Sequence, residues 1–468
     1  MATASSLLLL LFLLFSSFVF PFISPSTITI PLSPTITKRP SSDPWEYLNH
    51  LATTSISRAH HLKSPKTNFS LIKTPLFSRS YGGYSMSLSL GTPSQTVKLI
   101  MDTGSSLVWF PCTSRYVCAS CNFPNTDITK IPKFMPRLSS SSKLIGCKNP
   151  KCAWVFGSSV QSKCHNCNPQ AQNCTQACPP YIIQYGLGST AGLLLSETIN
   201  FPNKTISDFL AGCSLLSTRQ PEGIAGFGRS QESLPLQLGL KKFSYCLVSR
   251  RFDDSPVSSD LILDMGPSTS DSKTTGLSYT PFQKNLASQS NPAFQEYYYV
   301  MLRKIIVGKT HVKVPYSFLV PGSDGNGGTI VDSGSTFTFV EGHVFELLAK
   351  EFEKQMANYT VATNVQKLTG LRPCFDISGE KSVVIPDLTF QFKGGAKMQL
   401  PLSNYFAFVD MGVVCLTIVS DNAAALGGDG GVRSSGPAII LGNFQQQNFY
   451  IEYDLENDRF GFKEQSCA

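Results

Sequence analysis

The chain has 468 residues, of which 42% are hydrophobic and only 15% charged, so it is long enough for two or three domains and too apolar for general disorder. Its formal net charge of +8 is scattered rather than gathered into a stripe, which argues against a nucleic-acid-binding surface. Abundant Phe and Tyr, with many Thr and Val, favour strands over long helices.

The first predicted element is a secretory signal peptide covering residues 1–25. Residues 7–22 form an apolar stretch, and small and hydroxylated residues follow it. A signal anchor is the alternative, because no Lys or Arg precedes the stretch. No second long apolar run occurs, so we expect no stable membrane span. Four N-x-S/T sequons agree with export and are candidate glycosylation sites: Asn68, Asn173, Asn203 and Asn358.

Residues 26–80 are rich in Ser, Thr and Pro and show no strong periodicity, which predicts a propeptide or a flexible lead. Apolar and polar residues then alternate over residues 84–90, the period of a half-buried strand. A second strand is predicted at residues 97–101, and it runs directly into Asp102.

The remaining chain divides at a polar, Pro-containing stretch, residues 249–259, which we interpret as a linker. Residues 81–248 then form an N-terminal β lobe with a cysteine-rich insertion, and residues 260–468 form a C-terminal β lobe. Residues 341–358 show helical spacing of apolar residues and are the only strong helix that we predict.

The chain also repeats itself. Residues 100–105 (IMDTGS) are echoed by residues 330–335 (IVDSGS), and each copy is followed later by two apolar residues and a glycine, at 224–226 (IAG) and 440–442 (ILG). We therefore expect two β lobes of similar plan, each of which contributes one aspartate to a shared site.

The repeated motif suits acid–base chemistry by a pair of carboxyl groups, Asp102 and Asp332. Glycine allows the tight turn that brings backbone N–H groups toward the carboxylate, and the flanking hydroxyls can orient it. Two carboxyls about 3 Å apart share one proton, as in the aspartic-protease dyads from which this rule is drawn. The charged member can then activate water while the protonated one donates to a peptide carbonyl, with no metal or other cofactor.

At these residues the chain resembles the pepsin family of aspartic proteases, in particular its plant nepenthesin-like branch. The segments 102–109 (DTGSSLVW) and 332–336 (DSGST) match the two active-site motifs of the family, and the resemblance extends over residues 81–467. It implies an all-β, bilobal pepsin-like fold, two β-barrel-like lobes with an active-site cleft between them.

The resemblance also implies roles for residues around the two aspartates. Tyr185 and Gly186 match the flap that closes over a bound peptide, and Trp109 matches the side chain that hydrogen-bonds to the flap tyrosine. An ordinary core tyrosine and tryptophan are the alternatives, as are ordinary turn residues for the serines. The implied active-site support comprises Thr103 and Ser333, which brace the loops, Ser105 and Ser335, which bind the outer carboxylate oxygens, and Gly104 and Gly334.

The 14 cysteines are best interpreted as disulfides in an exported chain. Nine lie between Cys112 and Cys178 and five between Cys213 and Cys467, so at least one bridge must leave the first cluster if all pair. The resemblance implies a bridge between Cys374 and Cys415. We expect seven disulfides and no free thiol. A zinc site is the alternative, suggested by two C-x-x-C pairs: Cys118 with Cys121, and Cys164 with Cys167.

The sequence thus predicts a secreted aspartic-type endopeptidase that is made as a proenzyme, works best in acid and cleaves between bulky apolar residues. We expect a monomer that acts on protein or peptide substrates and binds pepstatin-type inhibitors, located in the apoplast or cell wall, with the vacuole as the alternative. The competing hypothesis is a non-catalytic binding protein, because the plant branch includes xylanase-inhibitor-like relatives that bind glycosidases.

Overall fold

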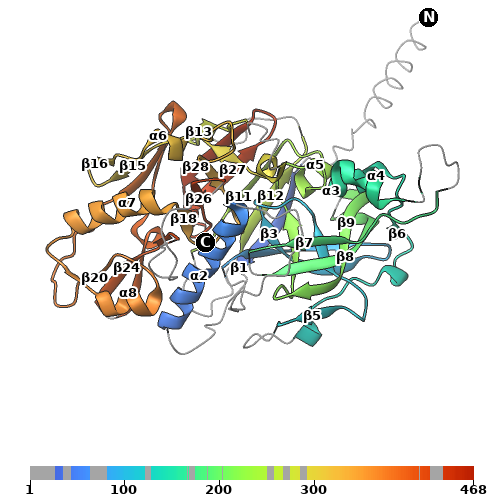
Figure 1. The fold of residues 1–468 in the computed structure, drawn as a ribbon, viewed down its shortest axis with the longest axis horizontal. Helices are drawn as coiled ribbons and strands as arrows, with labels where there is room; N and C mark the ends of the chain where they lie inside the picture. The colour runs from blue at the N-terminus through green and yellow to red at the C-terminus, as the bar shows by residue number, and fades with distance from the viewer. Residues whose placement is uncertain are drawn as a thin grey trace, which may run out of the picture.

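A computed structural model of the chain gives the arrangement of its elements (Figure 1). The structure describes residues 27–34, 44–63, 82–121, 128–165, 167, 174–186, 188–202, 204–249, 258–266, 275–284, 292–410, 412–421 and 436–467. The predicted signal peptide and most of the predicted linker lie outside these ranges.

The described chain is mostly β, as predicted, and its largest sheet has 15 strands that run through both halves. In spatial order this sheet contains β13 (Ser278–Pro281), β28 (Arg459–Glu464), β27 (Phe449–Asp454), β11 (Lys242–Cys246), β12 (Ser259–Asp264), β1 (Thr27–Pro34), β2 (Tyr84–Leu90), β3 (Gln95–Asp102), β10 (Gly223–Gly226), β4 (Trp109–Pro111), β9 (Lys204–Thr218), β8 (Ser189–Phe201) and β6 (Lys143–Leu144), with β5 (Val117–Ala119) on β9 and β7 (Tyr181–Gln184) on β8.

Three smaller sheets belong to the C-terminal half. A five-stranded sheet contains β14 (Tyr299–Val300), β17 (Thr329–Val331), β26 (Ile439–Leu441), β18 (Thr338–Val340) and β25 (Ile418–Val419). Two four-stranded sheets contain β16 (Thr310–Val312), β15 (Leu302–Val307), β21 (Leu388–Phe392) and β22 (Lys397–Gln399), and β19 (Thr360–Val361), β20 (Cys374–Asp376), β24 (Val413–Leu416) and β23 (Phe406–Asp410).

The helix predicted at residues 341–358 is present as α7 (Gly342–Gln355), and its apolar face, including Leu348 and Phe352, is buried. The prediction that it is the only strong helix is wrong, because α2 (Pro44–Lys63) is six residues longer. The other described α-helices are short: α3 (Pro150–Phe156), α4 (Val160–Lys163), α5 (Leu234–Gln237), α6 (Tyr316–Leu319) and α8 (Thr363–Thr369). Within the described ranges, no helix combines the length and apolar character needed to cross a bilayer.

Two described elements lie within residues 26–80, where the sequence predicts a propeptide or a flexible lead. Strand β1 is an interior strand of the large sheet, pairing antiparallel with β12 on one side and β2 on the other. Helix α2 lies between the two halves of the molecule (Figure 1). These parts of the segment are therefore built into the fold rather than flexible.

The sequence repeat corresponds to a structural repeat around each aspartate. Strand β3 ends at Asp102 and pairs in parallel with β10, so that Gly226 lies opposite Asp102. In the other half, β17 leads to Asp332 and pairs in parallel with β26. In both halves the third strand of the unit pairs antiparallel with the central one, β4 on β10 and β18 on β26.

All 14 cysteines form disulfides, which accounts for the seven bridges expected from the sequence. The bridge that leaves the N-terminal cluster joins Cys112 to Cys213. The four cysteines considered as zinc ligands all form disulfides instead. The remaining pairs are Cys118–Cys121, Cys147–Cys164, Cys152–Cys178, Cys167–Cys174, Cys246–Cys467 and Cys374–Cys415.

Candidate active site

The two aspartates are held by matching hydrogen bonds, one set in each repeat. The Gly104 N–H donates to Oδ1 of Asp102 at 2.9 Å, and the Ser105 hydroxyl donates to Oδ2 at 2.6 Å. The Gly334 N–H and the Ser335 hydroxyl make the same two contacts to Asp332, at 2.9 and 2.6 Å. Each carboxylate is thus fixed on both oxygens, which leaves the dyad little freedom to rotate.

A second pair of side chains joins the two loops across the interface between the halves. The Thr103 N–H donates to Oγ of Ser333 at 3.1 Å, and the Ser333 N–H donates to Oγ1 of Thr103 at 2.9 Å. The hydroxyls in turn donate to the backbone oxygens of Val331 and Met101. Because both residues are buried, this reciprocal bracing sets the two loops face to face.

The predicted flap residues lie over the same site. Tyr185 follows β7, and its hydroxyl accepts a 2.7 Å hydrogen bond from Nε1 of Trp109, which is fully buried. Gly186 approaches the backbone of α2 so closely that a Cβ there would lie 2.8 Å from Cα of Arg58. The residues predicted to form the flap are therefore packed against α2.

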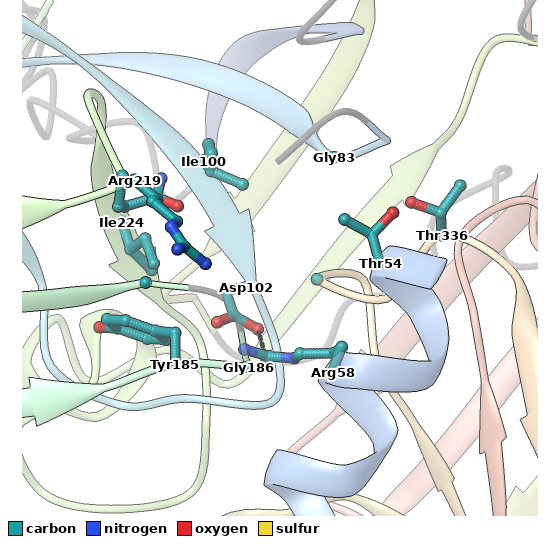
Figure 2. A pocket seen from close by; sticks show the side chains of 13 residues that line it. Thr54, Arg58, Gly83, Ile100, Asp102, Tyr185, Gly186, Arg219, Ile224 and Thr336 are labelled. Atoms are coloured by element: carbon teal, nitrogen blue, oxygen red, sulfur yellow. Dashed lines mark hydrogen bonds and ion pairs between the residues drawn. The ribbon is translucent and has the colours of Figure 1, made fainter. Parts of the chain in front are cut away.

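One side chain of α2, Arg58, lies between the carboxyl groups of Asp102 and Asp332. Nη2 of Arg58 lies 2.6 Å from Oδ1 of Asp102 and 3.4 Å from Oδ1 of Asp332, and Nε lies 3.1 Å from Oδ2 of Asp332. Figure 2 shows Arg58 extending from the helix toward Asp102. A single guanidinium that contacts both carboxylates shows that the two groups lie together, and it fills the space between them.

Helix α2 is anchored mainly on the C-terminal half. Its apolar face, with Leu51 and Leu62 fully buried, packs in one cluster with Phe337, Phe339 and other residues of that half. The Ser55 hydroxyl also accepts a 2.8 Å hydrogen bond from the Phe337 N–H, one residue beyond the Asp332 motif. At about 25 cal/mol per Å² of buried apolar surface, such a face supplies much of the docking free energy.

The ionisation of the dyad is uneven. Burial raises the pKa of Asp102 above its usual range, and the nearby negative charge of Asp332 adds to this effect while Arg58 opposes it. For Asp332 burial acts in the same direction, but the charge of Arg58 and the hydrogen bonds from Ser335 and Gly334 outweigh it, so its pKa is lowered. This asymmetry favours one charged and one protonated carboxyl.

A pocket opens beside Asp102, between the N-terminal half and α2, and α2 contributes Thr54 and Arg58 to its lining (Figure 2). Ile100, Ile224 and the ring of Tyr185 give it an apolar wall, and Arg219 extends into it from the turn after β9. The sequence did not indicate Arg219, because its position depends on the turn between β9 and β10.

Arg58 and α2 were also missed by the sequence analysis, although α2 carries a signal. Its buried apolar residues lie on one face at helical spacing, at Leu48, Leu51, Ala52, Ala59 and Leu62, and Glu46 in its first turn and Lys63 in its last suit the helix dipole. The Ser- and Thr-rich composition around this pattern concealed it.

Of the predicted sequons, Asn358 is exposed in the turn after α7, whereas Asn68, Asn173 and Asn203 lie outside the described residues.

Comparison with known proteins adds two family matches. A family model described as "Xylanase inhibitor N-terminal" matches residues 84–263, and one described as "Xylanase inhibitor C-terminal" matches residues 297–464. Among curated relatives, a probable aspartyl protease of Arabidopsis thaliana is 32% identical over 82% of each chain. Aspartic proteinase nepenthesin-1 of Nepenthes gracilis is 31% identical over 83% of this chain and 78% of its own.

Solved structures with a similar fold are more distant in sequence. The crystal structure titled "edgp" is 20% identical, with a TM-score of 0.64 over 95% of this chain and 96% of its own. Basic 7S globulin from soybean is 18% identical, with a TM-score of 0.59 over 94% of this chain and 97% of its own. These likenesses support the predicted all-β, pepsin-like fold class.

Proposed function

Since the chain belongs to the atypical plant aspartic protease family, we propose that it is an aspartic endopeptidase whose catalytic residues are Asp102 and Asp332. The observation that carries this proposal is the pair of carboxylates that arrive from two repeated loops, are held by the same hydrogen bonds and meet a single guanidinium. In the reaction, the charged carboxylate takes a proton from water, whose oxygen attacks the peptide carbonyl carbon. The protonated carboxyl donates its proton to the carbonyl oxygen.

Peptide cleavage follows when a proton passes to the amide nitrogen of the resulting tetrahedral intermediate and the C–N bond breaks. The flap, with Tyr185 and Gly186, covers the substrate, and Trp109 positions Tyr185 by hydrogen bonding. While Arg58 is present, the pKa of Asp332 is lowered and that of Asp102 is raised, so the dyad of the precursor holds Asp332 charged and Asp102 protonated. Release of Arg58 removes a charge that lowers both pKa values, which favours activity in acid.

The enzyme is made as an inactive precursor, in which α2 covers the dyad and Arg58 takes the place of substrate. Maturation then requires that α2, which lies within residues 26–80, leaves the dyad. Because β1 is an interior strand of the large sheet, maturation that removes it must break its pairing with β12 and β2. If β1 stays in the sheet, release of α2 requires two cuts, one between β1 and α2 and one between α2 and β2.

Export through the secretory route to the apoplast or cell wall fits the leader at residues 1–25 and the seven disulfides. The protein acts as a monomer, and the exposed Asn358 is a glycosylation site. A pepstatin-type peptide inhibitor binds in the cleft once α2 has left.

The competing function is binding of a glycosidase without catalysis, and the two family-model descriptions favour it. Degeneration of the active-site motifs would be expected in such a protein. Here Asp102, Asp332 and the hydrogen bonds to both are intact, which favours the enzyme.

The test is digestion of a peptide library by the secreted, acid-treated protein across pH, with and without pepstatin. We expect cleavage near pH 3–5 that pepstatin stops and that Asp102→Asn and Asp332→Asn each abolish. Asp260→Asn, at an exposed position of β12, is the matched control and keeps full activity. Retained cleavage in either dyad variant refutes the assignment. A wild-type protein that cleaves nothing, binds no pepstatin and captures a glycosidase supports the competing function.

A further inference from the structure

The pocket beside Asp102 combines an apolar wall with two positively charged side chains, Arg58 of α2 and Arg219. Its wall is formed by Ile100, Ile224 and Tyr185, and Arg219 extends into the same space (Figure 2). Because Asp102 and Gly186 of the predicted flap also line it, a side chain that enters this pocket belongs to a substrate residue close to the cleaved bond.

Arg219 has no acidic partner among the described residues. Its Nε is inaccessible to solvent and makes no hydrogen bond within the part of the chain that the structure describes. The nearby carboxylates are engaged elsewhere: Glu222 contacts Lys98 at 3.4 Å, and Asp102 contacts Arg58 at 2.6 Å. Burial lowers the pKa of Arg219, and no carboxylate offsets that effect. A buried donor without a partner destabilises the protein unless a ligand satisfies it.

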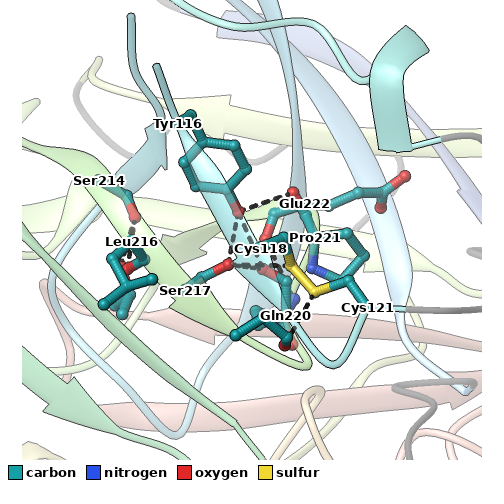
Figure 3. The surroundings of a disulfide bond; sticks show 11 residues. Tyr116, Cys118, Cys121, Ser214, Leu216, Ser217, Gln220, Pro221 and Glu222 are labelled. Atoms are coloured by element: carbon teal, nitrogen blue, oxygen red, sulfur yellow. Dashed lines mark hydrogen bonds between the residues drawn. A yellow bond between two sulfur atoms is a disulfide. The ribbon is translucent and has the colours of Figure 1, made fainter.

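The turn that carries Arg219 is held rigidly (Figure 3). The Tyr116 hydroxyl lies 2.5 Å from Oγ of Ser217, and Ser217 donates to the backbone oxygen of Gln220 at 2.7 Å. The disulfide between Cys118 and Cys121 lies against the same turn, with Sγ of Cys118 3.1 Å from Oγ of Ser217. This network fixes the backbone on both sides of Arg219.

Arg219 itself has a positive φ of 54°, in the left-handed region that favours glycine, and its N–H donates to the Ala119 oxygen at 2.9 Å. A strained non-glycine residue beside a candidate active site, kept in place by a surrounding network, suggests a functional reason for the side chain. The strain is tolerated because the network determines the backbone, and its consequence is a guanidinium aimed into the pocket.

We propose that Arg219 selects peptide substrates with a carboxylate side chain, Glu or Asp, at the position that enters this pocket. The inference rests on the proposed endopeptidase function and gives it a substrate class different from cleavage between bulky apolar residues alone. A guanidinium matches a carboxylate with two parallel hydrogen bonds, and the methylene groups of glutamate suit the wall of Ile100 and Ile224. Arg58 also lines the pocket, but its guanidinium contacts the dyad and leaves with α2.

The experiment uses peptides with both termini blocked, so that only a side chain can supply a carboxylate. Each pair of peptides differs in Glu against Gln at one position flanking the cleaved bond. The measured quantity is the Glu/Gln ratio of kcat/KM for the acid-treated protein, in which any general loss of activity cancels. We expect a ratio of about 10 or more at one position and at pH 5, and a smaller ratio at pH 3, where glutamate with its usual pKa of about 4.3 is mostly protonated.

Three variants identify the source of the preference. Arg219→Met keeps the unbranched side chain without charge and brings the ratio to about 1, whereas Arg219→Lys retains part of the preference. Arg115→Met removes a positive charge from an exposed position of the same half and leaves the ratio unchanged. Equal cleavage of the Glu and Gln peptides by the wild type, or a preference that persists in Arg219→Met, overturns the proposal.

A binding arm separates this proposal from the proposed function. Peptide pairs in which a reduced amide replaces the cleaved bond are titrated into the same proteins and into full-length Arg58→Ala. Tighter binding of the Glu peptide that disappears in Arg219→Met supports the Arg219 assignment even if no peptide is cleaved. Cleavage of peptides without any Glu preference in either arm leaves the endopeptidase function intact and refutes the role of Arg219.

Discussion

The Asp102 loop and the Asp332 loop are held by the same hydrogen bonds, yet they have different neighbours. Around Asp102 lie the flap, Trp109 and the pocket that Arg219 enters. The Asp332 motif instead continues into Phe337, where α2 docks through Ser55 and its apolar face. The repeat thus gives the two aspartates equivalent surroundings, while the N-terminal half forms most of the pocket beside Asp102 and the C-terminal half holds most of the docked helix α2.

The largest change is expected from removing the guanidinium that α2 brings to the dyad. Truncation of one member of a buried ion pair typically costs about 3–5 kcal/mol, so Arg58→Ala weakens the docking of α2 and raises the activity of the uncleaved precursor by about 100-fold or more. Activity is measured at pH 5 on the full-length chain, with its length checked by mass spectrometry. Arg58→Lys, which keeps the charge, stays mostly latent. Unchanged latency of Arg58→Ala would show that α2 blocks the cleft without needing the ion pair.

The next largest effect concerns the pH at which α2 leaves. Burial, together with the charge of Arg58, lowers the pKa of His61 to about 4, although Asp332 opposes this, and its ring lies near that of Tyr185. Released α2 has an ordinary His61 pKa near 6.5, so only the released form gains a proton between pH 6.5 and 4. Docking therefore loses about 3 kcal/mol as the pH falls through this window, and His61 has no effect above it.

The variant His61→Gln, which stays neutral, should shift acid activation to lower pH. Activation is followed by the release of latent activity across pH, and His60→Gln is the comparison on the same helix, because His60 is 46% exposed and lies beside Asp421 rather than beside the dyad. The lowered pKa of Asp332 acts in the same direction, since its stabilising contribution is lost as the pH falls. An unchanged activation profile in His61→Gln would assign acid release to the carboxylates alone.

The sequence predicted the symmetric part of the site better than the asymmetric part. Repeated motifs place Asp102 and Asp332 in equivalent turns, and the same pattern predicted their supporting glycines and hydroxyls. Arg58 and Arg219 were not predicted, because each reaches the site through tertiary packing: one on a helix that docks between distant strands, the other on a turn fixed by Tyr116, Ser217 and a disulfide. The odd number of cysteines in the N-terminal cluster likewise required one bridge to leave it. That this bridge joins Cys112 to Cys213 follows from the pairing of β4 with β9, which the sequence did not predict.

The symmetry of the two loops can be tested at the residues that brace them. Thr103→Val and Ser333→Ala each remove one hydroxyl and leave a backbone N–H of the opposite loop without its acceptor. Because both sites are buried, each change should lower the free energy of unfolding by about 1–3 kcal/mol, measured by urea denaturation. Similar losses are expected for the two variants, because each removes one of two equivalent hydrogen bonds. Very unequal losses would contradict a symmetric brace.

The smallest expected effect is on kcat/KM and comes from the hydrogen bond between Trp109 and Tyr185 in the N-terminal half. This bond lies beside Asp102, as the α2 docking surface lies beside the Asp332 motif. Trp109→Phe keeps a buried aromatic ring but removes the indole N–H that donates to Tyr185, so the hydroxyl of Tyr185 loses one fixed partner. A neutral hydrogen bond contributes about 1 kcal/mol, which predicts about a fivefold lower kcat/KM, and the lost bond and the smaller buried ring also lower the unfolding free energy. Tyr185→Phe removes the other partner of the same bond, and the double variant should be no worse than the more impaired single variant. Additive losses in kcat/KM would show instead that Trp109 acts on the substrate through some contact other than Tyr185.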